Sequence, residues 1–319
     1  MKKFFKYLSI LILISIIFTC LIFKNRILLC FSIGNKLIKN DLILDDDIEY
    51  ENNIIKDIVY KSTNNKNLTL DLYKAKIKEN KKSPVLIYIH GGSWSYGDKT
   101  IPEMLYPILN LFNEEGYSII SISYELMSNE INFEKQISDV KDAIRWVNKN
   151  KDIYNFNVNE VGLIGISSGA HLALMAGYTD NKEFTDDMTL ISYPSNVKYI
   201  LDFFGPTDLS TIDISKANEH IKNSLENNSN KDYIINKYSP INYIKKSKIK
   251  TLIVHSDSDN VVPYSNAISF YNKNKSIGNN TELLTLKNYN HNIENISIND
   301  IKELSISILK FIIWNSPLN

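Results

Sequence analysis

The segment from Leu163 to Leu174, LIGISSGAHLAL, encloses two serines between two glycines inside a hydrophobic run. Between a buried strand and a helix, a G-x-S-x-G pattern puts its serine on a sharp turn, where the hydroxyl projects above the sheet as a nucleophile. Gly165 and Gly169 allow the strand and the helix to approach closely, and the amino end of the helix favours negative charge nearby. We therefore predict that Ser167 is a nucleophile, with a purely structural turn as the alternative.

A nucleophilic serine needs a general base, and the base needs an acidic group that orients it. In the fold built around this turn, the residues occur in the order serine, acid, histidine. His291 alone follows the last predicted strand, in the polar loop NYNHNI, so we predict that it is the base; a solvated loop histidine is the alternative. The remaining histidines receive no catalytic assignment: His90, His171 (expected to pack or cap), His220 and His255.

Two carboxylates follow a buried strand in the segment LIVHSDSDNVVP, namely Asp257 and Asp259. Carboxylates are rarely placed beside a core strand for stability alone, but this pair could also cap the next helix. Either carboxylate could hold the histidine in the correct tautomer and stabilise the imidazolium. The chemistry of the two residues leaves the choice between them open.

Acyl transfer also needs hydrogen-bond donors for the negative charge that develops on oxygen. The segment YIHGGSWSYGDK places a glycine-rich loop directly after a strand predicted at 84–90, where the second donor of such a site lies. We predict that the backbone N–H groups of Gly92, Ser93 and Ser168 form an oxyanion hole, each contributing about 10²–10³ in rate. A plain turn is the alternative reading of HGG.

The elements that must position these residues alternate between strands and helices from residue 54 onward. Two strands, 54–60 and 67–73, are joined by a polar turn and predict an antiparallel pair. The later segments predict βαβ units and hence a mostly parallel sheet with helices on both faces. Strands are expected at 84–90, 117–124, 161–166, 199–204, 250–256 and 282–288, and helices at 102–115, 133–150, after Ser167, at about 264–275 and at 300–314. The polar residues 206–248 are too long for a normal crossover and predict a small lid.

The amino terminus differs from the rest of the chain. Residues 7–23 contain no charge and follow MKKFFK, which predicts a membrane anchor over residues 1–34, in contact with the bilayer through residues 7–33. A linker, residues 35–53, then leads to the folded domain, residues 54–319. A cleaved signal, giving a secreted form, is the alternative, but no small-x-small cleavage site follows the segment. We expect the folded domain to lie outside the cytoplasm.

Composition excludes several classes of function. The 36 basic and 36 acidic residues balance, so nucleic acid is not an expected partner. Both cysteines, Cys20 and Cys30, belong to the amino-terminal segment, so the folded domain has no disulfide, thiol nucleophile or thiolate metal site. The sequence contains neither an H-E-x-x-H helix nor a phosphate-binding loop, and no metal or cofactor is expected.

Several segments in the correct order resemble the carboxylesterases of the α/β-hydrolase superfamily, close to the hormone-sensitive-lipase-like and feruloyl-esterase-like (BD-FAE) branch. They are HGGSWSYGDK, GISSGAHLAL, FFGPTDL, SPINYI and HSDSDNVVP. The resemblance implies an α/β-hydrolase fold, and it assigns the acid to Asp259, which stands three residues before Val-Pro as in the family. Ser93 and Ala170 replace family glycines but keep their backbone N–H groups. The loop NYNHN lacks the glycine that usually precedes the family's histidine.

The resemblance implies a serine hydrolase of short or medium acyl esters that works through an acyl-enzyme. The substrate is expected to be a small-molecule ester, an acylated sugar or cell-envelope component among the candidates. Two alternatives stay open. The same machinery hydrolyses amides in prolyl-oligopeptidase-like peptidases and arylformamidases, and a hydrolase fold can also serve as a catalytically silent surface binding module.

Overall fold

The structure is a computed structural model that describes residues 53–63, 66–75, 81–128, 130–213, 219–292 and 296–315. The chain divides into two compact units, Glu49–Ile308 and Met1–Ile48 with Leu309–Asn319. The sheet belongs to the first unit, whereas the described part of the second is the end of helix α9 (Ile298–Asn315). The anchor predicted for residues 1–34, and the linker as far as residue 52, lie outside the described residues. Among the helices that are described, none has the length and apolar character needed to cross a membrane.

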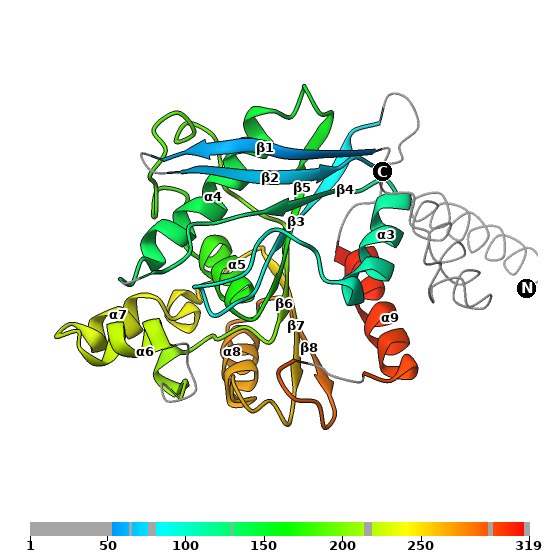
Figure 1. Cartoon of the computed structure of the whole chain (residues 1–319). Coiled ribbons are helices and arrows are strands. Elements are labelled where there is room, and N and C mark those ends of the chain that lie inside the picture. Colours follow the sequence, from blue (N-terminus) through cyan, green and yellow to red (C-terminus); the bar gives the residue numbers. More distant parts are fainter. Residues whose placement is uncertain are drawn as a thin grey trace, which may run out of the picture. The chain divides into compact units, whose positions relative to one another are not determined.

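The first unit contains an eight-stranded sheet in the order β1-β2-β4-β3-β5-β6-β7-β8 within the described residues (Figure 1). The antiparallel β1–β2 pair and the mostly parallel sheet agree with the sequence prediction; the β2–β4 pair is also antiparallel, and the later neighbours are parallel. The strands are β1 Ile54–Ser62, β2 Asn67–Tyr73, β3 Ser83–Ile89, β4 Ser118–Ile122, β5 Phe156–Ile166, β6 Tyr199–Phe203, β7 Lys250–Ser256 and β8 Thr281–Leu286. The continuous apolar run of β3 is buried on both faces because helices cover the sheet on each side.

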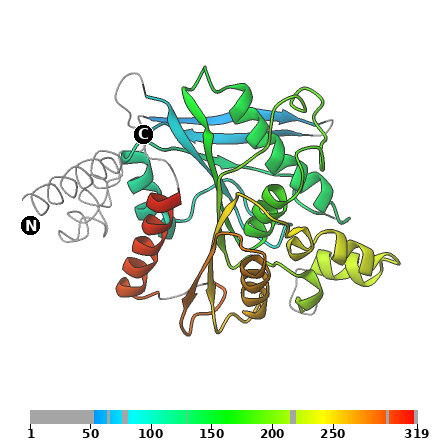
Figure 2. The same cartoon turned by 180° about the vertical axis from the view of Figure 1, so that it is seen from behind.

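Helices occupy both faces of this sheet. Figures 1 and 2 show α4, α5 and α8 on one face and α3 on the other. Their bounds are α3 Tyr106–Glu114, α4 Phe133–Lys149, α5 Ser168–Tyr178 and α8 Ser265–Ser276. The amphipathic pattern of α4 puts Ile137, Val140, Ile144 and Val147 in the core, each with no exposed area. A mostly parallel sheet between two helical layers is the arrangement of the α/β-hydrolase fold, and this prediction is confirmed.

The polar stretch between β6 and β7, predicted as a lid at 206–248, folds into short helices in its described parts. They are η3 Leu209–Thr211, α6 Glu219–Glu226, α7 Lys231–Lys237 and η5 Pro240–Tyr243. The two ends of this insertion are tied together, since Ile241 N donates to Thr207 O (2.9 Å) and Leu209 N to Ser239 Oγ (2.9 Å). In Figure 1 the helices α6 and α7 lie farther from the sheet than α5 and α8.

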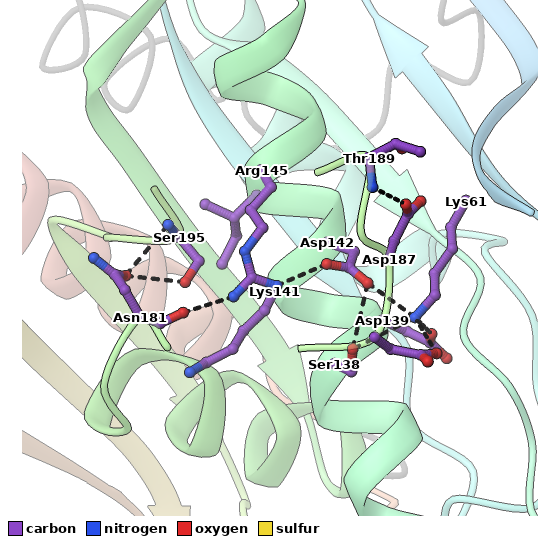
Figure 3. Close-up of polar contacts among 12 residues, drawn as sticks. Lys61, Ser138, Asp139, Lys141, Asp142, Arg145, Asn181, Asp187, Thr189 and Ser195 are labelled. Atoms are coloured by element: carbon purple, nitrogen blue, oxygen red, sulfur yellow. Dashed lines mark hydrogen bonds and ion pairs between the residues drawn. The ribbon is translucent and has the colours of Figure 1, made fainter. Parts of the chain in front are cut away.

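A buried charge network joins the edge of the sheet to α4 (Figure 3). The ammonium of Lys61 on β1 lies 2.7 Å from Asp139 and 2.9 Å from Asp142, and Asp142 lies 2.7 Å from Arg145. Arg145 also donates to the carbonyl of Asn181 at 2.8 Å. Burial raises the pKa of Asp139 to about 6, although Lys61 acts in the opposite direction. Because each charge has a partner of opposite sign, the network fixes β1, α4 and the loop after α5 together.

Candidate active site

Ser167 occupies a strained turn between β5 and α5. Its backbone has φ 53° and ψ −120°, a conformation that costs a residue other than glycine about 1–3 kcal/mol. The turn is fixed from the neighbouring strand, because Ser167 N donates to Phe203 O at 2.7 Å. A strained residue held in this way by its surroundings is a candidate for function.

The glycines around Ser167 are required by close packing. A Cβ atom on Gly165 would lie 2.4 Å from the carbonyl oxygen of Gly169, and one on Gly169 would lie 2.2 Å from the carbonyl oxygen of Ile89. Both distances are far below van der Waals contact. Helix α5 therefore begins against the ends of β5 and β3, which explains why two glycines enclose the serines.

His291, in the loop after β8, lies beside Ser167 although 124 residues separate them along the chain. Its Nε2 is 2.8 Å from Ser167 Oγ, and its Nδ1 is 2.8 Å from Asp259 Oδ2. A carboxylate can only accept, so Nδ1–H donates to Asp259 and leaves Nε2 to accept from the Ser167 hydroxyl. The arrangement can remove a proton from Ser167 and hold the resulting imidazolium against a carboxylate.

The side chain of Asp259 is buried and is fixed through both of its oxygens. Oδ1 accepts from the amides of Val261 (2.8 Å) and Val262 (2.9 Å), while Oδ2 faces His291. Burial raises the pKa of Asp259, but hydrogen bonds from His255 and His291 outweigh it and hold the pKa well below its ordinary value. The other candidate acid lies elsewhere: Asp257 is paired with Lys287 at the surface, 3.0 Å away.

His255 also contacts this carboxylate, a role that the sequence did not indicate. It is the penultimate residue of β7 and has no exposed area, and its Nε2 lies 2.9 Å from Val262 O and 3.3 Å from Asp259 Oδ2. The only signal in the sequence is its position four residues before Asp259. Of the remaining histidines, His90 stacks on Tyr124 with ring centroids 4.2 Å apart, and His220 lies in α6.

The loop of residues 91–97, here called the oxyanion loop, passes beside the nucleophile. A Cβ atom on Gly91 would lie 3.5 Å from Ser167 Cβ. The amides of Gly92, Ser93 and Ser168 donate to no acceptor among the described residues. Free donors next to a nucleophile can receive an oxyanion. The same described residues contain no cluster of three or more His, Cys, Asp or Glu side chains suited to a metal ion.

The sequence matches a model of a known protein family. The model for BD-FAE matches residues 70–273, which is more than half of the chain. The chain belongs to the BD-FAE family. The resemblance seen in the sequence motifs is thereby confirmed.

Curated relatives of this family member include esterases. Esterase LipC of Mycobacterium tuberculosis is 25% identical over 65% of this chain and 52% of its own length. An acetylxylan esterase of Xylanibacter ruminicola is 22% identical over 67% of this chain and 42% of its own length. The chain spans about half the length of the curated relatives it matches.

Solved structures establish the same fold. A truncated carbohydrate esterase from gut microbiota superposes with a TM-score of 0.69 at 24% identity. The match covers 83% of this chain and 98% of that one. At this identity the likeness supports the α/β-hydrolase fold of the BD-FAE member and says nothing of its substrate.

Proposed function

We propose that this protein is a serine hydrolase of carboxylic esters, with Ser167 as nucleophile, His291 as general base and Asp259 as the orienting acid. The observation that carries the proposal is the chain of two 2.8 Å contacts from Ser167 Oγ through His291 to Asp259. The strained turn at Ser167 and the esterase relatives of the family support the same reaction.

In this reaction Ser167 Oγ attacks the ester carbonyl carbon while His291 Nε2 takes the hydroxyl proton. The carbonyl oxygen becomes an oxyanion that accepts hydrogen bonds from the amides of Gly92, Ser93 and Ser168. When the tetrahedral intermediate collapses, the bond to the alcohol breaks and His291 returns the proton to the leaving oxygen. Water, deprotonated by His291, then attacks the acyl-enzyme and releases the carboxylic acid and free Ser167.

The proposed substrates are esters of short or medium acyl chains. The acetylxylan esterase among the relatives supports an acetylated saccharide as one such substrate. The insertion between β6 and β7 and the oxyanion loop are the proposed determinants of specificity, because both adjoin the carboxyl ends of the strands that carry the site.

We also propose that residues 1–34 anchor the protein to a membrane, with the folded domain outside the cytoplasm. The uncharged run of residues 7–23 supports this. Extraction of cell membranes with alkaline carbonate should leave an anchored chain in the pellet; release into the supernatant would contradict the proposal.

The hydrolase proposal is tested with the full chain on p-nitrophenyl acetate, butyrate and octanoate. We expect the wild type to hydrolyse at least one ester and Ser167→Ala to lower kcat by at least about 10³-fold. Ser276→Ala, an exposed serine at the end of α8, is the matched control and should retain full activity. A folded wild type that is no faster than Ser167→Ala on every ester would refute the proposal.

A further inference from the structure

The oxyanion loop has hydrogen bonds of its own, from Ser95 N and Tyr96 N to Gly92 O (3.0 Å each), but part of its backbone is strained. Gly92, Ser93 and Trp94 have consecutive φ values of 119°, 46° and 61°. Residues other than glycine rarely adopt a positive φ. Ser93 and Trp94 therefore keep this backbone conformation only because contacts with their surroundings stabilise it. The direction of the Gly92 and Ser93 amides depends on those contacts.

Trp94 connects the loop to α4 and α5. Its carbonyl accepts from Met127 N at 2.9 Å and from Gln136 Nε2 at 2.8 Å. Its indole Nε1–H donates to His171 Nδ1 at 3.1 Å. The indole ring also packs edge-on against Phe133 and His171, with centroids 5.4 and 5.2 Å away. The backbone and side chain of Trp94 are therefore held separately.

His171 connects this indole to the insertion. It lies on α5, one turn after Ser167, with no exposed area, and its Nε2–H donates to the carbonyl of Tyr238 at 2.7 Å. Tyr238 is the C-cap of helix α7, in the insertion between β6 and β7. Burial lowers the pKa of His171 to about 4, so at neutral pH one ring nitrogen accepts and the other donates. Packing, expected from the sequence, is only part of its role.

We propose that His171 is a positioning residue: by holding the Trp94 indole it directs the Gly92 and Ser93 amides toward Ser167, and through Tyr238 it couples the oxyanion loop to the insertion. The inference rests on the proposed ester hydrolysis. It concerns side chains that do not touch the substrate, because Trp94 is only 7% exposed and His171 is fully buried.

Two substitutions at His171 test its two hydrogen bonds one at a time. His171→Gln can place an amide N–H near the position of Nε2, keeping the donor for Tyr238 and removing the acceptor for Trp94. His171→Asn can place an amide oxygen near the position of Nδ1, keeping the acceptor for Trp94 and removing the donor for Tyr238. Trp94→Phe removes the indole donor and leaves His171 intact.

We expect His171→Gln and Trp94→Phe each to lower kcat for p-nitrophenyl acetate by about 10- to 100-fold, because a misplaced oxyanion donor loses transition-state contact. KM should change less than about threefold, and the double variant should be no slower than the slower single variant. His171→Asn should stay within about fivefold of the wild-type kcat. Tyr178→Phe is the control at the other end of α5, since it removes a buried hydroxyl bonded to Thr251 and Asn274. It should lower the melting temperature without changing kcat.

The wild type and Ser167→Ala are measured in the same series. Wild-type kcat in His171→Gln, or equal losses in His171→Gln and His171→Asn, would overturn the positioning role while the hydrolase proposal stands. If the losses of kcat correlated with the decreases in melting temperature across all variants, Tyr178→Phe included, the positioning role would also be overturned. A wild type as slow as Ser167→Ala would overturn both proposals.

Discussion

At the scale of single residues, the two oxygens of Asp259 have separate partners. The amides of Val261 and Val262 hold one oxygen, which leaves the other fixed in direction toward His291. Since these bonds keep the pKa of Asp259 well below its ordinary value, the carboxylate stays charged throughout the neutral range. A charged, immobile acceptor sets the tautomer of His291 and therefore the acceptor offered to Ser167.

Replacing Asp259 tests this assignment. Asp259→Asn keeps the size of the side chain but removes the charge, and the histidine then loses the acceptor that selects its tautomer. We expect kcat for p-nitrophenyl acetate to fall by about 10³–10⁴-fold with the fold retained. Asp257→Asn should leave kcat unchanged, because that carboxylate pairs with Lys287 at the surface. Equal losses in the two variants would contradict the assignment.

Local pattern explains which of these residues could be predicted. Ser167 and its glycines form one short motif, and His291 was identified by its place in the chain after the last strand. The sequence therefore predicted two residues that the fold brings together. Only the spacing of the family motif distinguished Asp259 from Asp257. The contact between Trp94 and His171 could not be predicted, because 77 residues separate two side chains whose types alone suggest ordinary packing. The catalytic roles themselves remain predictions for the experiments above.

At the scale of elements, β1 lies at the edge of the sheet and is fixed to α4 by buried charges as well as by its pairing with β2. A buried ion pair contributes little net stability compared with an apolar pair, but removing one partner leaves a charge uncompensated. The position of β1 therefore depends on Lys61, which faces Asp139 and Asp142 (Figure 3).

Lys61→Met should be strongly destabilising for this reason. We expect the free energy of unfolding to fall by about 3–5 kcal/mol, measured by urea denaturation. Lys287→Met is the matched control, since it removes an equivalent lysine from an exposed pair with Asp257 and should cost less than about 1 kcal/mol. If the two variants lost the same stability, the buried network would not have the role assigned to it.

At the scale of the whole molecule, the alternation of strand and helix segments predicted the architecture, because short apolar runs indicate buried strands and amphipathic repeats indicate helices. The short helices α6 and α7 were not predicted, since the polar insertion offers no such period. Strand β5 begins at Phe156, five residues before its predicted start, because Phe156 pairs with Ser83 at the start of β3, ahead of an irregularity in the register.

Global stability should depend on pH through His171. Its folded pKa of about 4 lies below the ordinary value of 6.5, so both states are neutral above pH 6.5. As pH falls from 6.5 toward 4, the unfolded chain binds the proton first, and the free energy of unfolding decreases by up to about 3 kcal/mol. Urea denaturation at pH 7 and pH 4.5 should show a larger decrease in the wild type than in His171→Gln. Equal decreases would show that His171 contributes nothing.

The most direct test of the central claim is covalent labelling of the full chain with diethyl p-nitrophenyl phosphate, followed by intact mass measurement and peptide mapping. In this reaction Ser167 Oγ forms a bond to phosphorus and p-nitrophenolate leaves, so the reagent reports the nucleophile itself. We expect one diethylphosphoryl group per chain, on Ser167, with no label on Ser167→Ala and much slower labelling of His291→Ala. Labelling at another residue, or equal labelling of wild type and Ser167→Ala, would contradict the assignment of Ser167 as the nucleophile.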